Sequence, residues 1–305
     1  MESVHISIVI PSYNGKEKVL RLLHALEKQT YLSFEVIVVI DGSTDGSAEA
    51  INSNTWTTFS LKVIEQNNNG RASARNIGVS HISTDRILFF DDDMVPFNTC
   101  IQEYIHFFQL HNNVIALGQI IEPASDEDSE IKKYKDYLNT QWNEKLNAYK
   151  QAIIPDSMTV LAAANVALST SLFNQLNGFD ERLKDIEDYD FALRAKQAGI
   201  KTYYVDSAIA KHQDDFSFQK YAERSKAYLK NRIRAKKQNP DLYKKDNILN
   251  HQHGFLLHLL YKLFKFHFWL KMFDSYTIFQ YILPKKVRYK LYGIAITAYI
   301  HNQDT

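Results

Sequence analysis

Ile87-Leu88-Phe89-Phe90-Asp91-Asp92-Asp93-Met94-Val95 is the stretch that decides the fold. Four apolar residues lead into three adjacent carboxylates, and such a short apolar run is typical of a strand buried on both faces of a sheet. Open α/β sheets bind ligands at the carboxyl ends of their strands, where these carboxylates stand. Three acidic side chains in a row repel one another unless they share a cation, which indicates a divalent metal held by oxygen. A helix cap is the alternative, because Asp93 shortly precedes Pro96 and a cap needs only one carboxylate.

Strand-like and helix-like segments alternate around this stretch. The predicted segments are strands at residues 6–10, 34–40, 61–64 and 202–206, and helices at residues 16–29, 71–80, 131–149 and 218–237. Alternation at this spacing predicts right-handed βαβ crossovers and a mostly parallel central sheet, which is an α/β fold.

The turn after the first predicted strand limits the kind of ligand. Residues 11–16 contain neither the G-x-G-x-x-G of a dinucleotide fold nor the G-x-x-x-x-G-K-[ST] of a P-loop. A dinucleotide-dependent redox enzyme and a P-loop kinase are therefore disfavoured. If a diphosphate is bound, a metal has to take the place of the glycine cradle.

Four segments, in this order, resemble those of family 2 glycosyltransferases with the GT-A fold. They are Val9-Ile10-Pro11-Ser12-Tyr13-Asn14, Val38-Val39-Ile40-Asp41-Gly42-Ser43-Thr44-Asp45-Gly46-Ser47, Asn69-Gly70-Arg71-Ala72-Ser73-Ala74-Arg75-Asn76-Ile77-Gly78 and Phe90-Asp91-Asp92-Asp93. The resemblance extends through residue 215 and departs at Ile40, where family members often carry a further aspartate. It implies a GT-A fold and an inverting, hexosyltransferase-type reaction, from a UDP-sugar to a hydroxyl of a glycan or lipid-linked glycan, with Mn²⁺ or Mg²⁺.

The resemblance also implies a donor site at the first two predicted strands. Asp41 is expected to accept the N3–H of the uracil, with Pro11 and Tyr13 against the base. Forming the turn that follows it is the alternative role of Asp41. Arg71 and Arg75 lie four residues apart, on one face of the predicted helix, and Arg71 is expected to contact phosphate or ribose.

Asp91 and Asp93 form the D-x-D pair of the resembled family. Alternate residues of an extended segment face the same way, so both can approach one cation. Asp93 is the first expected metal ligand, and Asp91 is expected at the metal, a metal-bound water or the ribose. Asp92 is grouped with the nucleotide-binding residues, its side chain expected to turn away and hold the loop. His212, after the strand at residues 202–206, completes the metal site in many members of the fold; a structural histidine is the alternative.

The second half resembles the acceptor side of the family. Gly178-Phe179-Asp180-Glu181 and Glu187-Asp188-Tyr189-Asp190-Phe191-Ala192-Leu193-Arg194 correspond to the segment that carries the catalytic base. Asp188 is the expected base, and Glu187 either takes that role or holds an arginine. The alternative is that both stabilise a helix start, where the macrodipole favours carboxylates. The acidic residues 122–130 and the helix after them are expected to form a flap over the acceptor.

The composition is that of a globular protein, with 45% hydrophobic and 23% charged residues. Cys100 is the only cysteine, so no internal disulfide can form and a reducing, cytoplasmic setting is expected. The first residues lack the basic start and long apolar run of a signal peptide.

The charge is divided unevenly along the chain. Residues 216–305 hold 17 Lys and Arg against five Asp and Glu, a net +12, which leaves −11 for residues 1–215. The predicted organisation is a catalytic domain at 1–215, with a donor half at about 1–121 and an acceptor half at about 122–215, and a basic, aromatic helical tail at 216–305.

The tail contains a long apolar run at residues 255–273, interrupted by three lysines and two histidines. Such a run is too charged to span a bilayer and is typical of a helix in the membrane interface. The tail is therefore expected to hold the protein peripherally on the inner face of the cell membrane. Packing on the catalytic domain or on a partner subunit is the alternative, and no nucleic-acid-binding motif accompanies the charge.

Two other functions stay open at this point. A sugar-1-phosphate nucleotidylyltransferase shares the architecture but needs a glycine-rich turn where residues 11–16 stand. A non-catalytic scaffold on the membrane surface would have no use for the carboxylates at positions 91, 93, 187 and 188. The sequence leaves the transferred sugar and the oligomeric state open.

Overall fold

The computed structural model describes residues 5–125, 127–158, 161–214, 217–244, 264, 267–275 and 282–301. The chain divides into two compact units. The first comprises Met1–Glu122 and Asn139–Asp214, and the second comprises Pro123–Leu138 and Asp215–Thr305. Most of the apolar run predicted to lie in the membrane interface falls outside the described residues.

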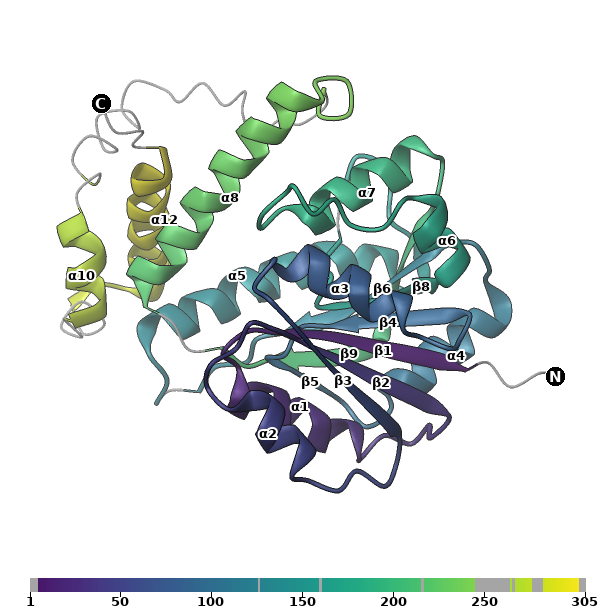
Figure 1. Cartoon of the computed structure of the whole chain (residues 1–305). Helices are drawn as coiled ribbons and strands as arrows, with labels where there is room; N and C mark the ends of the chain where they lie inside the picture. The colour runs from purple at the N-terminus through teal and green to yellow at the C-terminus, as the bar shows by residue number, and fades with distance from the viewer. Residues whose placement is uncertain are drawn as a thin grey trace. The chain divides into compact units, whose positions relative to one another are not determined.

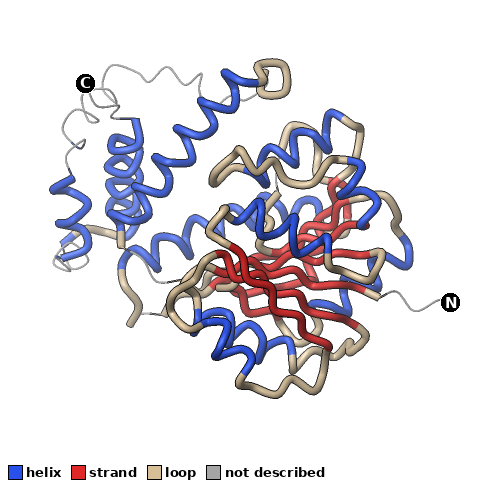
Figure 2. Tube along the Cα trace, in the orientation of Figure 1, coloured by secondary structure: helices blue, strands red, loops and turns tan. Residues whose placement is uncertain are grey.

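The first unit is built on one sheet with helices on both faces (Figures 1 and 2). Along the sheet the order is β3-β2-β1-β4-β8-β6-β9-β5, and β7 pairs with β9. The strands are β1 (Ile6–Ser12), β2 (Phe34–Asp41), β3 (Ser60–Gln66), β4 (Arg86–Phe90), β5 (Met94–Pro96), β6 (Ile115–Ile121), β7 (Ala152–Ile153), β8 (Asn165–Ser169) and β9 (Thr202–His212). The parallel pairing predicted for the first half holds for β3, β2, β1 and β4. Beyond β4 the sheet is mixed, because β8 runs antiparallel to both β4 and β6.

The chain has helices on both faces of this sheet and further helices in the second unit. They are α1 (Lys16–Leu26), α2 (Ser47–Asn52), α3 (Arg71–Ser80), α4 (Cys100–Leu110), α5 (Glu130–Leu146), α6 (Thr170–Gln175), α7 (Glu187–Gln197), α8 (Phe218–Gln238), α10 (His267–Ser275) and α12 (Lys285–His301). Helices α1, α2 and α4 share a core with Leu88 and Phe90 of β4, whereas α3, α6 and α7 pack on the face of Ile87 and Phe89. The apolar run of β4 is therefore buried on both sides, as its sequence predicts.

Strand β9 is longer than the strand predicted at residues 202–206. A register shift opposite Gly118 and Gln119 separates the pairing of Val205 from that of Ile209. This irregularity accommodates extra residues in β9, which then continues to His212. His212 consequently lies in a strand and not in the loop that follows one.

The second unit has its own aromatic core. Helices α8, α10 and α12 and the start of α5 bury Phe218, Tyr289 and Tyr292 together. At the edge of this core Glu130 accepts a hydrogen bond from Tyr292 at 3.1 Å and lies 3.0 Å from Nε of Arg288. Among the described residues, no helix combines the length and the apolarity that a membrane span requires.

Candidate active site

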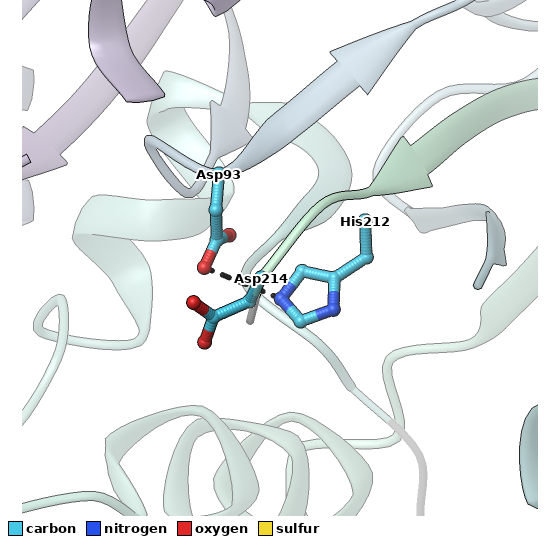
Figure 3. A group of neighbouring side chains, drawn as sticks. All are labelled: Asp93, His212 and Asp214. Carbon is cyan, nitrogen blue, oxygen red and sulfur yellow. Dashed lines mark ion pairs between the residues drawn. The ribbon is translucent and has the colours of Figure 1, made fainter. Parts of the chain in front are cut away.

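Asp93, His212 and Asp214 come together where β4 and β9 end. One ligand atom from each lies within 4.8 Å of the others. Figure 3 shows the three side chains converging, with the ion pair between Asp93 and His212 dashed. The antiparallel pairing of β5 and β9 brings them together, because Met94 lies opposite His212 and Gln213 N donates to Asp93 O at 2.8 Å.

The chemistry of this group suits a divalent cation. Two carboxylates and an imidazole are ligands for Mn²⁺, and the carboxylates also suit Mg²⁺. Asp93 is only 8% exposed, and its Oδ1 has no hydrogen-bond partner among the described residues. A buried carboxylate oxygen without a partner is costly, and coordination to a cation would satisfy it.

Glu122 completes the surroundings of the imidazole. Nε2 of His212 lies 3.3 Å from Asp93 Oδ2, and Nδ1 lies 3.3 Å from Glu122 Oε1. A carboxylate behind a metal-binding histidine fixes the orientation of the ring. Burial lowers the pKa of His212, but hydrogen bonds to Asp93 and Glu122 outweigh burial and raise this pKa to about 9. A cation that binds here therefore displaces a proton from the ring.

The other two aspartates of the acidic stretch have different partners. Asp91 Oδ1 accepts a hydrogen bond from Arg75 at 2.5 Å, so it faces a guanidinium instead of His212. Asp92 Oδ2 accepts from Ser12 at 2.6 Å and lies so close to Gly15 that a side chain there would collide with it. Burial raises the pKa of Asp92 to about 7, with a further contribution from its acidic neighbours. Asp92 thus fastens the turn after β1.

Arg75 links this stretch to the start of α7. Its side chain is fully buried and donates to Glu187 Oε1 at 2.6 Å as well as to Asp91. Glu187 is buried on the guanidinium, whereas the next residue, Asp188, is partly exposed. Burial and the charge of Glu187 raise the pKa of Asp188 to about 6, and Arg75 opposes this rise. Of the two carboxylates at the start of α7, Asp188 is therefore the one that is not taken up by Arg75.

The residues expected around the nucleotide lie on β1, β2 and α3. Asp41 is buried, and its oxygens accept from Gln66 Nε2 at 2.6 Å, Asn69 N at 2.8 Å and Gly70 N at 2.9 Å. Asp41 therefore ties the end of β2 to the loop that leads into α3.

The three other residues of the expected nucleotide site differ in exposure. Pro11 is buried in β1, and Tyr13 is 55% exposed beyond the end of that strand. Arg71, in the first turn of α3, lies 3.3 Å from Asp185. An exposed ring and a partly exposed guanidinium are the groups here that a ligand could reach directly.

Sequence reasoning missed three residues of the site: Lys18, Glu122 and Asp214. Asp214 had a signal, since alternate residues of an extended segment face the same way and it stands two positions after His212. Lys18 and Glu122 had none, because only the folded chain brings α1 and the end of β6 to His212 and Asp214.

Comparison with known proteins identifies the family. The profile described as Glycosyl transferase family 2 matches residues 7–176, more than half of the chain. The chain belongs to this family. It is 29% identical over 209 residues to a glycosyltransferase of Haemophilus influenzae and 26% identical over 231 residues to the amylovoran biosynthesis glycosyltransferase AmsB of Erwinia amylovora. The matches cover 65% and 70% of this chain, and 64% and 70% of those relatives, so the relatives extend beyond the similar part.

Solved structures support the same fold. The mannosyltransferase PcManGT of Pyrobaculum calidifontis matches with a TM-score of 0.62 at 14% identity, over 98% of this chain and 88% of its own. TarS of S. aureus, residues 1–349 with UDP, matches with a TM-score of 0.52 at 18% identity, over 97% of this chain and 89% of its own. The expected GT-A fold is thus confirmed for this family 2 glycosyltransferase.

The cation group gives a test that separates Asp214 from other aspartates of the first unit. We expect Asp214→Asn to lower the affinity for Mn²⁺ by at least about tenfold, because it removes an anionic ligand. Titration of Mn²⁺, followed by the electron paramagnetic resonance signal of the free ion, measures this affinity. Asp206→Asn is the matched control, since Asp206 also lies in this segment of the chain but pairs with Lys150 at 3.5 Å. Equal affinities in the two variants would contradict the assignment.

Proposed function

We propose that this glycosyltransferase transfers a sugar, with inversion and with the help of Mn²⁺ or Mg²⁺, from a UDP-sugar to a hydroxyl of a glycan or lipid-linked glycan. One observation carries the proposal. An unbroken set of contacts runs from the acidic stretch through Asp91 and Arg75 to Glu187, and Asp188 stands next in the chain. A candidate cation group and a candidate base are thereby held at the same edge of the sheet.

The names of similar proteins support the choice of donor and acceptor. TarS has been crystallised with UDP and with UDP-GlcNAc, and GalNAc-T7 with UDP, GalNAc and Mn²⁺. PcManGT was solved with GDP-Man and Mn²⁺, so GDP-sugars are the natural comparison in a donor screen. The role of AmsB in amylovoran biosynthesis favours a glycan acceptor.

The proposed reaction assigns separate tasks to the carboxylates. Asp188 takes the proton of the acceptor hydroxyl while that oxygen attacks the anomeric carbon and the bond to the diphosphate breaks. Glu187 stays on Arg75 and keeps the start of α7 in place. Asp93, His212 and Asp214 would hold the divalent ion, which supplies positive charge to the departing diphosphate.

Binding measurements separate this proposal from the two alternatives. A scaffold of the same fold would give no Mn²⁺-dependent heat when titrated with UDP. A nucleotidylyltransferase would release diphosphate from UTP and a sugar-1-phosphate, which a transferase does not. Hydrolysis of a panel of UDP-sugars and GDP-sugars would then identify the donor.

We further propose that the second unit lies against an anionic membrane surface, which would make the enzyme peripheral on the inner face of the cell membrane. Ile282, just before α12, and Val287, in its first turn, have apolar side chains that are 65% and 45% exposed. Lys285 and Lys286 stand between them and are exposed as well. Apolar side chains flanked by lysines suit the headgroup region of a bilayer with anionic lipids.

The base assignment predicts a selective loss of activity. Asp188→Asn should abolish transfer, since an amide cannot accept the hydroxyl proton, while UDP binding stays within about threefold of the wild type. Transfer is measured by UDP release with acceptor present, and UDP binding by calorimetry with Mn²⁺. Asp190→Asn on the same helix is the control; Asp190 pairs with Arg194 at 2.7 Å. Unchanged transfer in Asp188→Asn would refute the role of Asp188.

The pKa of Asp188 predicts the acid side of the pH profile. Because this pKa is raised to about 6, the carboxylate is protonated below that pH and cannot act as a base. At saturating Mn²⁺ and donor, the turnover rate should fall by about tenfold per pH unit below pH 6 and level off above it. This limb is read from the turnover rate at saturation and not from UDP binding, because protonation of His212 weakens the binding of Mn²⁺ as the pH falls. A rate that stays constant down to pH 4.5 would contradict the prediction.

The membrane proposal predicts dependence on lipid charge. The protein should sediment with vesicles that contain phosphatidylserine and stay in solution with vesicles of phosphatidylcholine alone. Reversing Lys285 and Lys286 to Glu should weaken binding by at least about tenfold, since each lysine near such a surface contributes roughly 1 kcal/mol. Reversal of Lys28 and Lys62, two exposed lysines of the first unit, is the control. Equal losses in both double variants would mean that net charge alone matters.

A further inference from the structure

Lys18 places an ammonium group against the candidate cation site. Its Nζ donates to Asp214 Oδ1 at 2.8 Å and lies 3.8 Å from Asp93 Oδ2. The side chain is 36% exposed, so it reaches the site from the solvent side and is not locked in the core. Lys18 thus contacts two of the three residues that would hold a divalent ion.

Binding of a lysine ammonium and a divalent ion to the same two carboxylates is unfavourable. Like charges at such a short distance repel, and the repulsion is strong where the surroundings are partly buried. The arrival of the ion therefore displaces the ammonium from Asp93 and Asp214. The flexible four-carbon stem of a lysine allows this movement without a change in the backbone of α1.

The displaced ammonium needs an anion as a new partner. In the turn before α1, two groups that could otherwise bind the diphosphate of a sugar nucleotide are already hydrogen-bonded. The backbone N–H of Lys16 donates to Asp45 Oδ2 at 2.9 Å, and the hydroxyl of Ser12 donates to Asp92. Both groups are therefore committed to the protein's own carboxylates and not to a phosphate. A diphosphate bound beside the ion would bring negative charge within the range of Lys18.

We propose that Lys18 is a second cation of the donor site, which holds Asp93 and Asp214 when no ion is bound and contacts the donor diphosphate when an ion takes these carboxylates. This inference rests on the proposed metal-dependent binding of a UDP-sugar. Lys18 is on this view a donor-binding residue and takes no part in the proton transfer assigned to Asp188.

The proposal predicts opposite effects of one substitution on two affinities. In the full chain, Lys18→Met should bind Mn²⁺ alone about three- to tenfold more tightly, because no ammonium competes for the carboxylates. The same variant should bind UDP at saturating Mn²⁺ at least about tenfold more weakly, because a charge-assisted hydrogen bond is lost. Lys18→Arg keeps the charge and should bind UDP within about threefold of the wild type. Mn²⁺ is followed by electron paramagnetic resonance and UDP by calorimetry.

Arg21→Met is the matched control, since Arg21 lies one turn further along α1 and donates to the backbone oxygen of Gln213, at 3.4 Å, and not to a carboxylate of the described residues. It should change neither affinity. Suppose that the wild type binds both Mn²⁺ and UDP. If Lys18→Met then binds Mn²⁺ no more tightly than the wild type, or binds UDP equally well, the inference about Lys18 is overturned and the proposed function stands. If the wild type itself shows no Mn²⁺-dependent UDP binding, both are overturned.

Discussion

The buried guanidinium of Arg75 is the interaction on which the rest of the site depends. It reaches from α3 to Asp91 at the end of β4 and to Glu187 at the start of α7. Burying charges is expensive, and removal of one partner leaves the others uncompensated in the interior. Arg75 therefore ties together α3, the acidic stretch and the start of α7, the helix that carries Asp188. Glu187 is occupied in this role, which leaves Asp188 available for a substrate.

The three aspartates of the acidic stretch have three different partners, and Arg75 is the partner of only the first. Asp91 is neutralised by Arg75, Asp92 is buried on a serine hydroxyl, and Asp93 faces His212. Separate partners therefore ease the repulsion among them. The expectation that Asp91 lies at the metal, at a metal-bound water or at the ribose stays a prediction, and its contact with Arg75 is a partner that the sequence did not single out.

Much of the fold could be predicted because its signals are local. The apolar run of β4, the alternation of strands and helices and the glycosyltransferase motifs are all readable within short windows. Register between distant strands is not local, so the pairing of Met94 with His212 could not be predicted. The spacing of Asp214 from His212 is a local signal, but it says nothing about which strand the two residues face. The irregularity that extends β9 to His212 likewise has no pattern in the sequence. The hydrogen bonds that Asp41 accepts from the backbone of Asn69 and Gly70 could not be predicted from the sequence either.

The site also illustrates how a cluster of carboxylates can be stable in the absence of a divalent ion. The ammonium of Lys18 forms an ion pair with Asp214. The imidazole of His212 is protonated at neutral pH, because its pKa is raised to about 9. Binding of a metal would then exchange positive charges instead of adding them, which would lower its affinity for the protein alone. On the role proposed for Lys18, a diphosphate beside the ion would supply an anion for the displaced ammonium, so the ion and the nucleotide would each strengthen the binding of the other. In such a site the donor itself completes the electrostatic balance that the metal disturbs.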